Sequence, residues 1–519
     1  MPTVPISRVL YFTAIIIFFE VFKVLNREPI TEAIMKILFF LCLLLTFYKI
    51  VNIMALFIFA YEILECASWI FTYSGFNVQV LLAIDLNWCF EHHFSLFFAF
   101  SSLVIILVIV THYPLCDSKF IQINWHRYSI FIIMTLLYLF GFVTTFKNYL
   151  YPYEQMETLS PAVQKLFFNN LKHFLFDKIE VKKYQNEERK NLIILEIESL
   201  EQQILGSFNN LFPNSMPFLS NLSKYGTFVE RVETQPYTTW SVASLFAAQC
   251  NMPLLMSGKL MFNAASFHLL KQHRCIGDYL SSQGYKLFSF LCNVFIANFK
   301  KHLKMHHWVV EDLKEHKFNL DYDLFQYIGD TIIPNLTKKE NQPFVLHIAN
   351  ADTHPFPNYI VDERCVKHVP KKFNKMLKSF NCFDYIIGQF LKKVEASGIL
   401  NNTEVIIYGD HVLMSKEWKS ANIVDPRYIV FMLPYHNEMK RNVITKKSSL
   451  YDMAPTIMNL LGISEYSPHF PFGESIFSSK IGIIPDNRHF RFIYDFFSDK
   501  MNWEKEVNCK GEKGFCKQT

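Results

Sequence analysis

Five long apolar runs in the first 150 residues limit the fold of this chain more than any other feature of its sequence. A helix needs about 20 apolar residues to cross a lipid bilayer, and about 17 are tolerated. Four of the runs are long enough on this scale, and one, residues 34–48, is long enough only with its flanks. They predict a transmembrane domain of about five helices over residues 1–150, at residues 9–24, 34–48, 53–73, 94–110 and 130–146.

The basic residues between these runs indicate how the predicted membrane domain is oriented. Lysine and arginine in short loops favour the cytoplasmic side of a membrane. The basic residues of 23–36 favour an extracytoplasmic N-terminus, whereas the other loop residues favour a cytoplasmic one: Arg8, Lys49, Lys119 and Arg127. We therefore expect an integral, multi-pass membrane protein whose chain is extracytoplasmic after about residue 147.

Charge and cysteine content indicate which partners and which compartment to expect for the rest of the chain. The net charge of +5 over 519 residues gives no reason to expect a nucleic acid partner. Seven of the 11 cysteines follow the predicted membrane domain, and an extracytoplasmic compartment would permit disulfide bonds between them. Cys509 and Cys516, in a polar tail, are the pair that we expect to be bonded, and the pairing of the others stays open.

Residues 151–190 have the composition of a connector between the membrane and a soluble domain. Apolar residues recur at nearly helical spacing from Val163 to Phe174, which predicts an amphipathic helix. Two positions for this helix are equally open: on the membrane surface, or packed on the soluble domain. Beyond it, residues 191–480 are predicted to form the soluble domain, and residues 481–519 a C-terminal tail.

Two apolar segments end in residues that can ligate a metal. Residues 191–199 begin as a buried strand and end with Glu196 and Glu198. A second predicted strand ends in Asp410 and His411. In open α/β sheets, ligands bind at the carboxyl ends of the strands, and carboxylates beside an imidazole suit one divalent cation of the zinc or manganese type. We select Glu198 because it is nearer the strand end, with a salt-bridged acid as the alternative.

A group of hydroxyl residues follows Pro236. The apolar spacing predicts a helix that begins at Thr238 or Thr239 and includes Phe246. The N-terminus of a helix attracts phosphate, and a threonine hydroxyl there could attack a phosphorus atom if a metal lowers its pKa. Ordinary N-capping by threonine or serine is the structural alternative.

Three histidines complete the set of candidate site residues. His354 follows a predicted strand at residues 344–348, so it is also expected at a strand end. His302 and His306 are four residues apart on a predicted helix, which is the spacing of a metal-ligating pair. An exposed basic helix is the interpretation that we favour for this segment.

Glu198-Ser199, Thr238 and Gly409-Asp410-His411 occur in the order and context of a known family. The chain resembles the sulfatase-like branch of the alkaline phosphatase superfamily, above all its membrane-anchored members, the lipoteichoic acid synthases and lipid A phosphoethanolamine transferases. The resemblance covers nearly the whole chain. It implies about five membrane spans followed by an extracytoplasmic α/β domain of the sulfatase and alkaline phosphatase type, with a mostly parallel sheet.

The resemblance also assigns roles to the candidate residues. It implies one divalent metal ion, zinc or manganese, bound by Glu198, Thr238, Asp410 and His411. Thr238 corresponds to the nucleophile, because Ser241 and a run of small apolar residues follow it as in those enzymes. Thr239 takes this role if the alignment is shifted by one residue. His354 resembles the histidine of the family's His-Pro loop, which contacts substrate phosphate.

The function that this resemblance implies is the transfer of a phospho-headgroup. A phosphoethanolamine or phosphoglycerol group would move from a membrane phospholipid to an acceptor glycan or lipid through a phospho-threonine intermediate. Two alternatives stay open: a phosphodiesterase or sulfatase-like hydrolase that uses water as the acceptor, and a non-catalytic membrane protein that binds a lipid or partner. Residues 238–242 lack the Pro and Arg of the Cys/Ser-x-Pro-x-Arg motif of true sulfatases, which argues against sulfate-ester hydrolysis.

Overall fold

The computed structural model describes most of the chain that follows the predicted membrane domain. None of its helices has the combination of length and apolar character that crossing a bilayer requires, among the residues that it describes. The predicted membrane spans, and Cys509 and Cys516, lie outside these residues. The described residues belong to one compact unit and are 157–176, 179, 189–206, 212–254, 274–291, 297–312, 320–338, 342–354, 359–413, 426–436, 441–463 and 470–497.

A sheet of eight described strands forms the centre of this unit. The strands are β1 (Asn191–Ile197), β2 (Thr227–Val232), β3 (Lys286–Leu291), β4 (Val309–Asp312), β5 (Phe344–Ala349), β6 (Thr403–Gly409), β7 (Phe431–Leu433) and β8 (Asn442–Ser448). Their order is β4-β3-β5-β1-β6-β7-β2-β8, with β7 antiparallel to both of its neighbours. The other adjacent pairs are parallel, which confirms the predicted α/β class with a mostly parallel sheet.

The central strands β5, β1 and β6 are buried along almost their whole length. Their sequences are continuous apolar runs rather than alternating ones, as expected for parallel strands that are covered on both faces. In the register of the sheet, Ile197 of β1 lies opposite Gly409 of β6, and Glu196 lies opposite Ala349 of β5. The carboxyl ends of these strands therefore meet at one edge of the sheet.

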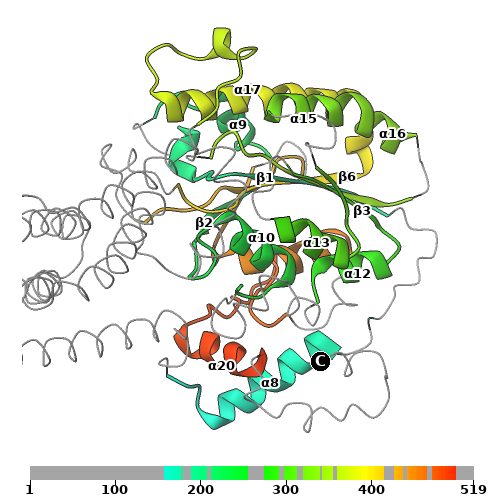
Figure 1. Ribbon diagram of the computed structural model, residues 1–519, viewed down its shortest axis with the longest axis vertical. Coiled ribbons are helices and arrows are strands. Elements are labelled where there is room, and N and C mark those ends of the chain that lie inside the picture. The colour runs from blue at the N-terminus through cyan, green and yellow to red at the C-terminus, as the bar shows by residue number, and fades with distance from the viewer. Residues whose placement is uncertain are drawn as a thin grey trace, which may run out of the picture. The chain divides into compact units, whose positions relative to one another are not determined.

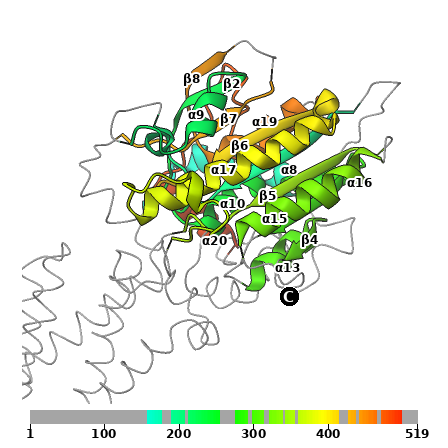
Figure 2. The same ribbon diagram turned by 90° about the horizontal axis from the view of Figure 1, so that it is seen from above.

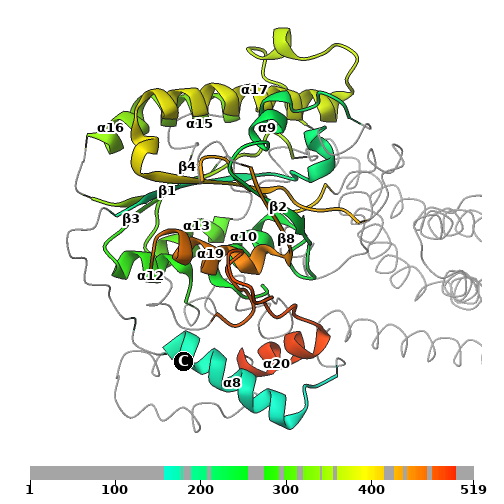
Figure 3. The same cartoon turned by 180° about the vertical axis from the view of Figure 1, so that it is seen from behind.

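Helices cover both faces of the sheet. The longer ones are α8 (Pro161–Phe176), α9 (Pro217–Leu222), α10 (Ser241–Cys250), α12 (Ile276–Ser282), α13 (Ala297–Met305), α15 (Asp321–Tyr327), α16 (Ile333–Thr337), α17 (Lys375–Ala396), α19 (Met453–Leu460) and α20 (Asn487–Phe497). Short turns of helix are η1 (Gln202–Leu205), η3 (Ile328–Ile332), η4 (Val366–His368), η5 (Ile399–Asn402) and η6 (Leu450–Asp452). α9, α15, α16 and α17 lie on one face, and α10, α12, α13 and α19 lie on the other (Figure 1, Figure 3).

A large hydrophobic cluster lies between the sheet and α17. It includes Ile193 and Leu195 of β1 together with Phe383 and Ile387 of α17, all nearly inaccessible to solvent. α15 lies beside α17 over the sheet (Figure 2), and its Phe325 packs edge-on against Phe383. Burial of each such side chain contributes about 1.5–3 kcal/mol. This packing holds β1, and therefore the residues at its carboxyl end, in a fixed position.

Helix α8 of the predicted connector packs on the soluble unit. The ring of Phe167 lies 5.3 Å from the rings of Phe472 and of Phe492 in α20. The Tyr279 hydroxyl of α12 donates a hydrogen bond to the carbonyl oxygen of Phe174 at 3.1 Å. Figure 3 shows α8 and α20 side by side beneath the helices that cover the sheet. Of the two positions that the sequence left open, the structure has the helix packed on the soluble domain, and α20 of the predicted tail packs there too.

Two disulfide bonds join segments of the described chain. Cys365 is bonded to Cys382 of α17, and Cys250 at the end of α10 is bonded to Cys275 at the start of α12. The sequence left the pairing of these cysteines open, because spacing along the chain does not determine which cysteines meet.

Candidate active site

Two neighbouring strand ends bring three of the predicted metal ligands together. β1 and β6 pair in parallel, so the residues that follow each strand start from the same edge of the sheet. Glu198, Asp410 and His411 each place one ligand atom within 4.8 Å of the others, and all three side chains are buried. These three of the four predicted ligands are therefore close enough to share one ion. The fourth, Thr238, is described below.

Hydrogen bonds join the two strand ends at this edge. Ser199 has a positive φ of 57°, and its N–H group donates a hydrogen bond to Asp410 Oδ1 at 2.7 Å. The Asp410 N–H group in turn donates to the carbonyl oxygen of Ile197 at 3.2 Å. A Cβ atom at Gly409 would lie 1.9 Å from the carbonyl oxygen of Leu200, so this close approach requires glycine.

The imidazole of His411 is oriented toward the two carboxylates. Its Nε2 atom lies 3.5 Å from Glu198 Oε1 and 3.4 Å from Asp410 Oδ2. On the other side of the ring, Nδ1 lies 2.9 Å from the carbonyl oxygen of Val412, to which an Nδ1–H group can donate. Metal-binding histidines commonly use one nitrogen in this way, which leaves the other nitrogen for the ion. The orientation of His411 therefore fits a metal ligand.

The electrostatics of the cluster also fit a cation. Burial raises the pKa of Asp410 well above its ordinary value, and the charge of Glu198 raises it further. Burial also acts to raise the pKa of Glu198, but the charges of His354 and His411 and two serine hydrogen bonds outweigh this effect, so its pKa is lowered. Buried carboxylates are costly unless they are paired or bound to metal. Two carboxylates and one imidazole are donors that both zinc and manganese accept.

A serine hydroxyl lies directly beside this cluster. Ser241, the first residue of α10, donates a hydrogen bond from its Oγ atom to Glu198 Oε2 at 2.8 Å. The same Oγ atom lies 3.5 Å from His411 Nε2. Ser241 as a residue is half-buried, whereas the three cluster side chains are fully buried. Ser241 thus combines the two properties that the sequence analysis sought in a nucleophile: a hydroxyl at a helix N-terminus and contact with the metal ligands.

Thr238 occupies a different position from the one expected. The prediction that the helix begins at Thr238 or Thr239 is wrong, since α10 begins at Ser241. Pro236 and Tyr237, whose φ is +61°, form a turn of the type II kind before the helix. The Thr238 hydroxyl donates to the Gln235 carbonyl oxygen at 2.8 Å and accepts from the Gln235 N–H group at 3.1 Å.

The hydrogen bonds of Thr238 are thus confined to its own turn, and its side chain is 1% exposed. Thr239 is exposed to solvent. In the described part of the chain, the hydroxyl groups of Thr238 and Thr239 form no hydrogen bond with Glu198, Asp410 or His411. Because of this turn the helix begins two or three residues later than predicted, and Ser241 is the hydroxyl residue that contacts the cluster.

Two residues that the sequence analysis did not select hold Glu198 in place. Asn350, directly after β5, accepts a hydrogen bond from the Glu198 N–H group at 2.7 Å. Thr353 donates from its hydroxyl to the Glu198 carbonyl oxygen at 2.8 Å, and Asn350 Nδ2 donates to Thr353 Oγ1 at 3.0 Å. Asn350 Nδ2 also donates to Asp321 Oδ2 at 3.0 Å. The place of Asn350 at a predicted strand end was the signal that could have identified it.

His354 follows the same strand end as Asn350. It is half-buried, and its N–H group donates to the carbonyl oxygen of Ala351 at 2.9 Å, which closes a turn. After burial, its charge is the largest influence on the pKa of Glu198. His354 therefore lies within electrostatic range of the predicted metal ligands, at the edge of the sheet where the sequence places it.

The second acid of β1 has a separate set of partners. Glu196 Oε2 lies 2.9 Å from His347 Nε2 and accepts a hydrogen bond from the Tyr408 hydroxyl at 2.8 Å. His347 also contacts the Ser289 hydroxyl through Nδ1, at 2.9 Å. Glu196 is therefore the salt-bridged structural acid, while Glu198 contacts the candidate ligands.

Comparison with known proteins shows the family of this chain. The Sulfatase family model matches residues 190–463, more than half of the chain. Phosphoglycerol transferase I of Salmonella arizonae is 26% identical over 288 residues, which cover 52% of this chain and 37% of the relative. The chain thus spans little more than a third of the curated relatives that it matches.

Two solved structures are similar to this chain at lower identity. The lipoteichoic acid synthase LtaP from Listeria monocytogenes is 20% identical, with a TM-score of 0.45 over 55% of this chain and 75% of that one. A protein in the alkaline phosphatase superfamily from Vibrio parahaemolyticus is also 20% identical, with a TM-score of 0.47 over 63% and 81% of the two chains. On the strength of the family match over residues 190–463, this chain belongs to the Sulfatase family.

Proposed function

We propose that this chain transfers a phospho-headgroup, phosphoglycerol or phosphoethanolamine, from a membrane phospholipid to a glycan or lipid acceptor. The observation that carries the proposal is the hydrogen bond from Ser241 Oγ to Glu198 Oε2, which sets a hydroxyl against a cluster fit for a metal ion. Similarity to a protein named phosphoglycerol transferase I supports phosphodiester chemistry. The apolar runs of residues 1–150 support an integral membrane enzyme whose catalytic domain is extracytoplasmic.

Ser241 takes the place of Thr238 as the proposed nucleophile. A nucleophilic hydroxyl must reach both the phosphorus atom and the groups that activate it. Ser241 contacts Glu198 and is partly exposed, whereas the Thr238 hydroxyl is buried and bonded within its turn. The residue before α10, Trp240, provides no side-chain cap, so the first turn of this helix offers N–H groups to phosphate oxygens.

The residues that would hold the metal are Glu198, Asp410 and His411. A divalent cation bound there would favour ionisation of the Ser241 hydroxyl and stabilise the charge that develops on the phosphoryl oxygens. The oxygen and nitrogen donors favour zinc or manganese. Asn350 and Thr353 keep the backbone of Glu198 in position, since they bind its N–H and C=O groups.

The proposed reaction has two steps. In the first, Ser241 Oγ attacks the phosphorus atom, the bond from phosphorus to the glycerol oxygen of diacylglycerol breaks, and diacylglycerol leaves with the proton that Ser241 gives up. In the second, an acceptor hydroxyl attacks the phosphoserine, the bond between Ser241 Oγ and phosphorus breaks, and Ser241 regains a proton from the acceptor. His354, on the neighbouring strand end, would bind the phosphoryl oxygens or protonate the leaving group.

Hydrolysis is the alternative within the same chemistry. Water would then replace the acceptor hydroxyl in the second step, and free headgroup would form in the absence of any acceptor. A non-catalytic membrane binding protein is the alternative of a different class. It has no need for the hydroxyl of a half-buried residue bonded to a buried carboxylate, and we therefore favour the enzyme.

Peptide mass spectrometry of the acid-quenched protein tests the proposal. The full chain is incubated in detergent with vesicles that contain either phosphatidylglycerol or phosphatidylethanolamine, and is then digested. We expect the mass of one headgroup phosphate on Ser241, and fragment ions distinguish this residue from Thr238 and Thr239 on the same peptide. Ser241→Ala should carry no adduct, whereas Thr238→Ala should keep it.

Two results of this experiment would contradict the proposal. An adduct on Thr238 or Thr239 would show that the nucleophile is wrongly assigned. Protein that turns over lipid without any adduct on this peptide would exclude the covalent route. Analysis of the released products with and without a glycan acceptor separates transfer from hydrolysis.

A further inference from the structure

Exposed apolar side chains occur on two segments of the soluble unit. In the chain before α20, Ile481, Ile483 and Ile484 are 60%, 44% and 40% exposed. On α8, Val163 and Leu166 are 43% and 63% exposed. Single exposed apolar residues are ordinary in folded proteins, whereas several in one place mark an interaction site. We call these five residues the apolar surface.

The two segments that carry the apolar surface are neighbours in the fold, and Phe472 contacts both of them. Its ring lies 5.3 Å from the ring of Phe167, which follows Leu166 in α8. Its carbonyl oxygen would lie 2.4 Å from a Cβ atom at Gly482, the residue between Ile481 and Ile483. Figure 3 shows α8 beside α20, which begins shortly after the isoleucines.

Hydrogen bonds hold the chain that leads into the three isoleucines. The Lys446 ammonium group of β8 donates to three of its carbonyl oxygens, those of Ser475, Ser478 and Lys480, at 2.7, 3.2 and 2.9 Å. Asp452 Oδ1 accepts a hydrogen bond from the N–H group of Glu474 at 2.8 Å. The fold therefore exposes the isoleucines from a backbone that is tied to the rest of the unit.

The same segment is anchored on the end of α10. Asn251 Oδ1 accepts hydrogen bonds from the N–H groups of Phe472 and Gly473, at 2.8 and 3.2 Å. The disulfide bond between Cys250 and Cys275 joins this end of α10 to α12. The apolar surface is therefore supported by two helices that are covalently linked.

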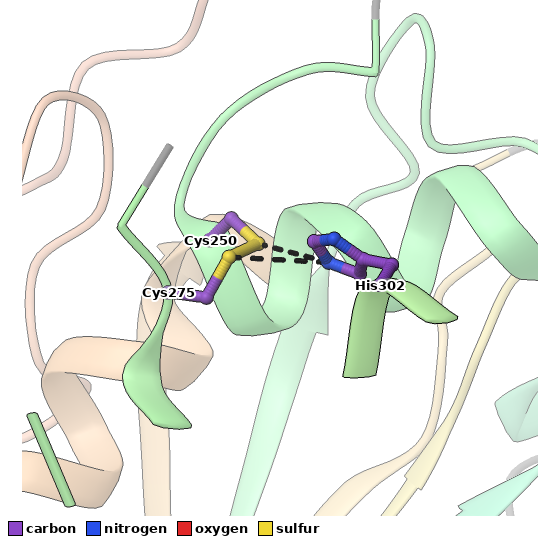
Figure 4. Close-up of side chains that lie close together, drawn as sticks. All are labelled: Cys250, Cys275 and His302. Carbon is purple, nitrogen blue, oxygen red and sulfur yellow. Dashed lines mark hydrogen bonds between the residues drawn. A yellow bond between two sulfur atoms is a disulfide. The ribbon is translucent and has the colours of Figure 1, made fainter. Parts of the chain in front are cut away.

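His302 and His306 belong to the interior beneath this support. The sequence favoured an exposed basic helix for this segment, and that expectation is wrong, because the two side chains are 0% and 3% exposed. Figure 4 shows the imidazole of His302 facing the two bonded sulfur atoms, from which its Nε2 atom lies 3.6 and 3.9 Å. His306 Nδ1 pairs with Asp278 Oδ2 at 2.7 Å.

Helix α20 connects the apolar surface to the candidate active site. The ring of Phe490, six residues after Ile484, lies 4.6 Å from the ring of Tyr237. Tyr237 forms the turn that precedes α10, and Ser241 begins that helix four residues later. The segment with the exposed isoleucines thus leads directly into a contact with the turn before the proposed nucleophile.

We propose that the apolar surface docks on a phospholipid bilayer, with its isoleucines between the headgroups and the acyl chains. Lys480 directly precedes Ile481, Lys165 directly precedes Leu166, and both lysines are exposed. Apolar side chains beside lysines are typical of segments that lie in the interface of a membrane with anionic lipids. Asp486, the acid nearest to the isoleucines along the chain, is paired with Arg488 at 2.6 Å.

The chain itself favours a bilayer over a protein as the occupant. Fourteen residues separate the last predicted span, at residues 130–146, from Pro161 at the start of α8. They can reach at most about 50 Å when fully extended, so the predicted spans keep a membrane within reach of α8. Docking would bring the edge with Ser241 to the level of the lipid phosphates. This last consequence rests on the proposed function, whereas the docking itself does not.

Photo-crosslinking tests the docking without any need for activity. The full chain is placed in vesicles of phosphatidylglycerol and phosphatidylcholine, with one residue at a time replaced by p-benzoylphenylalanine, which bonds to neighbouring C–H groups on irradiation. We expect the mass of a phospholipid on the peptides at Ile483 and Leu166. Phe140, in the last predicted span, is the positive control. Val309 of β4 is 54% exposed and is the matched negative control.

Three results would overturn the proposal. The first is a phospholipid adduct at Phe140 with none at Ile483 or Leu166. The second is a bond from Ile483 to another protein chain, which would identify a protein as the occupant. The third is lipid adducts that are as frequent at Val309 as at Ile483, which would show contact without a preferred surface.

Kinetics with two forms of lipid show what the docking does for headgroup transfer. Ile483→Ser with Ile484→Ser should raise the apparent KM for phosphatidylglycerol in vesicles by about tenfold. The rate with a short-chain, monomeric analogue should not change, and Val309→Ser should change neither value. An equal loss with both forms of lipid would show that the isoleucines act on the site and not on the membrane. A wild-type chain that transfers no headgroup would contradict the proposed function and leave the crosslinking result in force.

Discussion

The two ends of helix α10 carry two buried clusters of opposite character. At its N-terminus, Ser241 contacts a group of two carboxylates and one imidazole. At its C-terminus, Cys250 belongs to a group of two sulfur atoms and one imidazole. Both groups are buried, but the first lies beside the hydroxyl group of a half-buried serine and the second includes no hydroxyl group. Oxygen-rich metal sites with an adjacent open position suit catalysis, while a buried disulfide bond suits structural support.

The supports of the two clusters differ as well. Backbone hydrogen bonds between strand ends fix the carboxylate group, through Ser199 and Asp410. Helix ends fix the sulfur group, through Asp278 and Asn251. Loss of one group should therefore leave the other in place. The comparison predicts that substitutions at the N-terminal end change chemistry, and that substitutions at the C-terminal end change stability.

The largest effect is expected at Ser241. Ser241→Ala removes the proposed nucleophile and should lower the rate of headgroup transfer by at least about 10³-fold. Thr238→Ala removes hydrogen bonds within one turn and should cost about 1 kcal/mol of stability with little change in rate. Initial rates with labelled lipid in vesicles measure both. If Thr238→Ala lowered the transfer rate more than Ser241→Ala, Ser241 at this end of the helix would not be the nucleophile.

The next largest effect is expected for the carboxylates. Glu198→Gln and Asp410→Asn each replace a carboxylate ligand of the cluster by an amide, and should lower both bound metal and transfer activity by about 10²- to 10³-fold. Glu196→Gln is the matched control, because this buried acid pairs with His347 and Tyr408. It should reduce stability but retain the metal. Elemental analysis of the purified variants gives the metal content, and equal loss of metal in all three would contradict the distinction between the two acids.

Asn350 should show a smaller effect on the same cluster. Asn350→Ala removes the acceptor of the Glu198 N–H group and should lower metal affinity and activity by about 10- to 100-fold, as loss of an outer-shell partner does. Asn381→Ala is a control for the loss of a buried amide, since Asn381 donates to the Ser215 carbonyl oxygen instead. It should lower stability alone. If both variants bind metal with wild-type affinity, Asn350 does not position Glu198.

The carboxylate cluster was more accessible to sequence reasoning than the sulfur cluster, for a physical reason. Continuous apolar strands that end in Glu198 and in Asp410-His411 imply a common sheet edge, because parallel strands align their carboxyl ends. Ser241 was missed as the contacting hydroxyl because the turn at Tyr237 delays the helix. The hydrophobic pattern of the sequence does not indicate that a tyrosine has a positive φ.

The sulfur cluster depends on how three helices pack, which local patterns do not encode. Cys250 and Cys275 are separated by 25 residues, and His302 comes from a third helix. Lys300 and Lys304 give that helix a basic composition, from which we expected an exposed surface. The orientation of His302 toward α10 follows from contacts such as that of Asp278 with His306, and no periodicity in the sequence reports them.

The sulfur end of the helix should affect stability more than rate. Cys250→Ser with Cys275→Ser removes a cross-link that typically contributes about 2–4 kcal/mol, and should lower the unfolding midpoint under oxidising conditions. The rate of headgroup transfer should fall by no more than about threefold at a temperature where the variant is folded, because Ser241 keeps its contact with Glu198. A loss as large as that of Ser241→Ala would show that the two ends of α10 do not act separately.

The last effect comes from a buried acid pair behind the carboxylate cluster, and it depends on pH. Burial, and then the charge of Asp321, raise the pKa of Asp352 to about 9. Its ordinary pKa is 3.8, so the folded protein holds a proton at neutral pH that the unfolded chain has released. The contribution of Asp352 to stability is therefore greatest at low pH and declines as the pH rises from about 4 to about 9. The asparagine of Asp352→Asn does not titrate. The unfolding midpoint of this variant should therefore rise relative to that of the wild type as the pH is raised through this window. Parallel midpoints across the window would show that Asp352 is ionised in the folded protein.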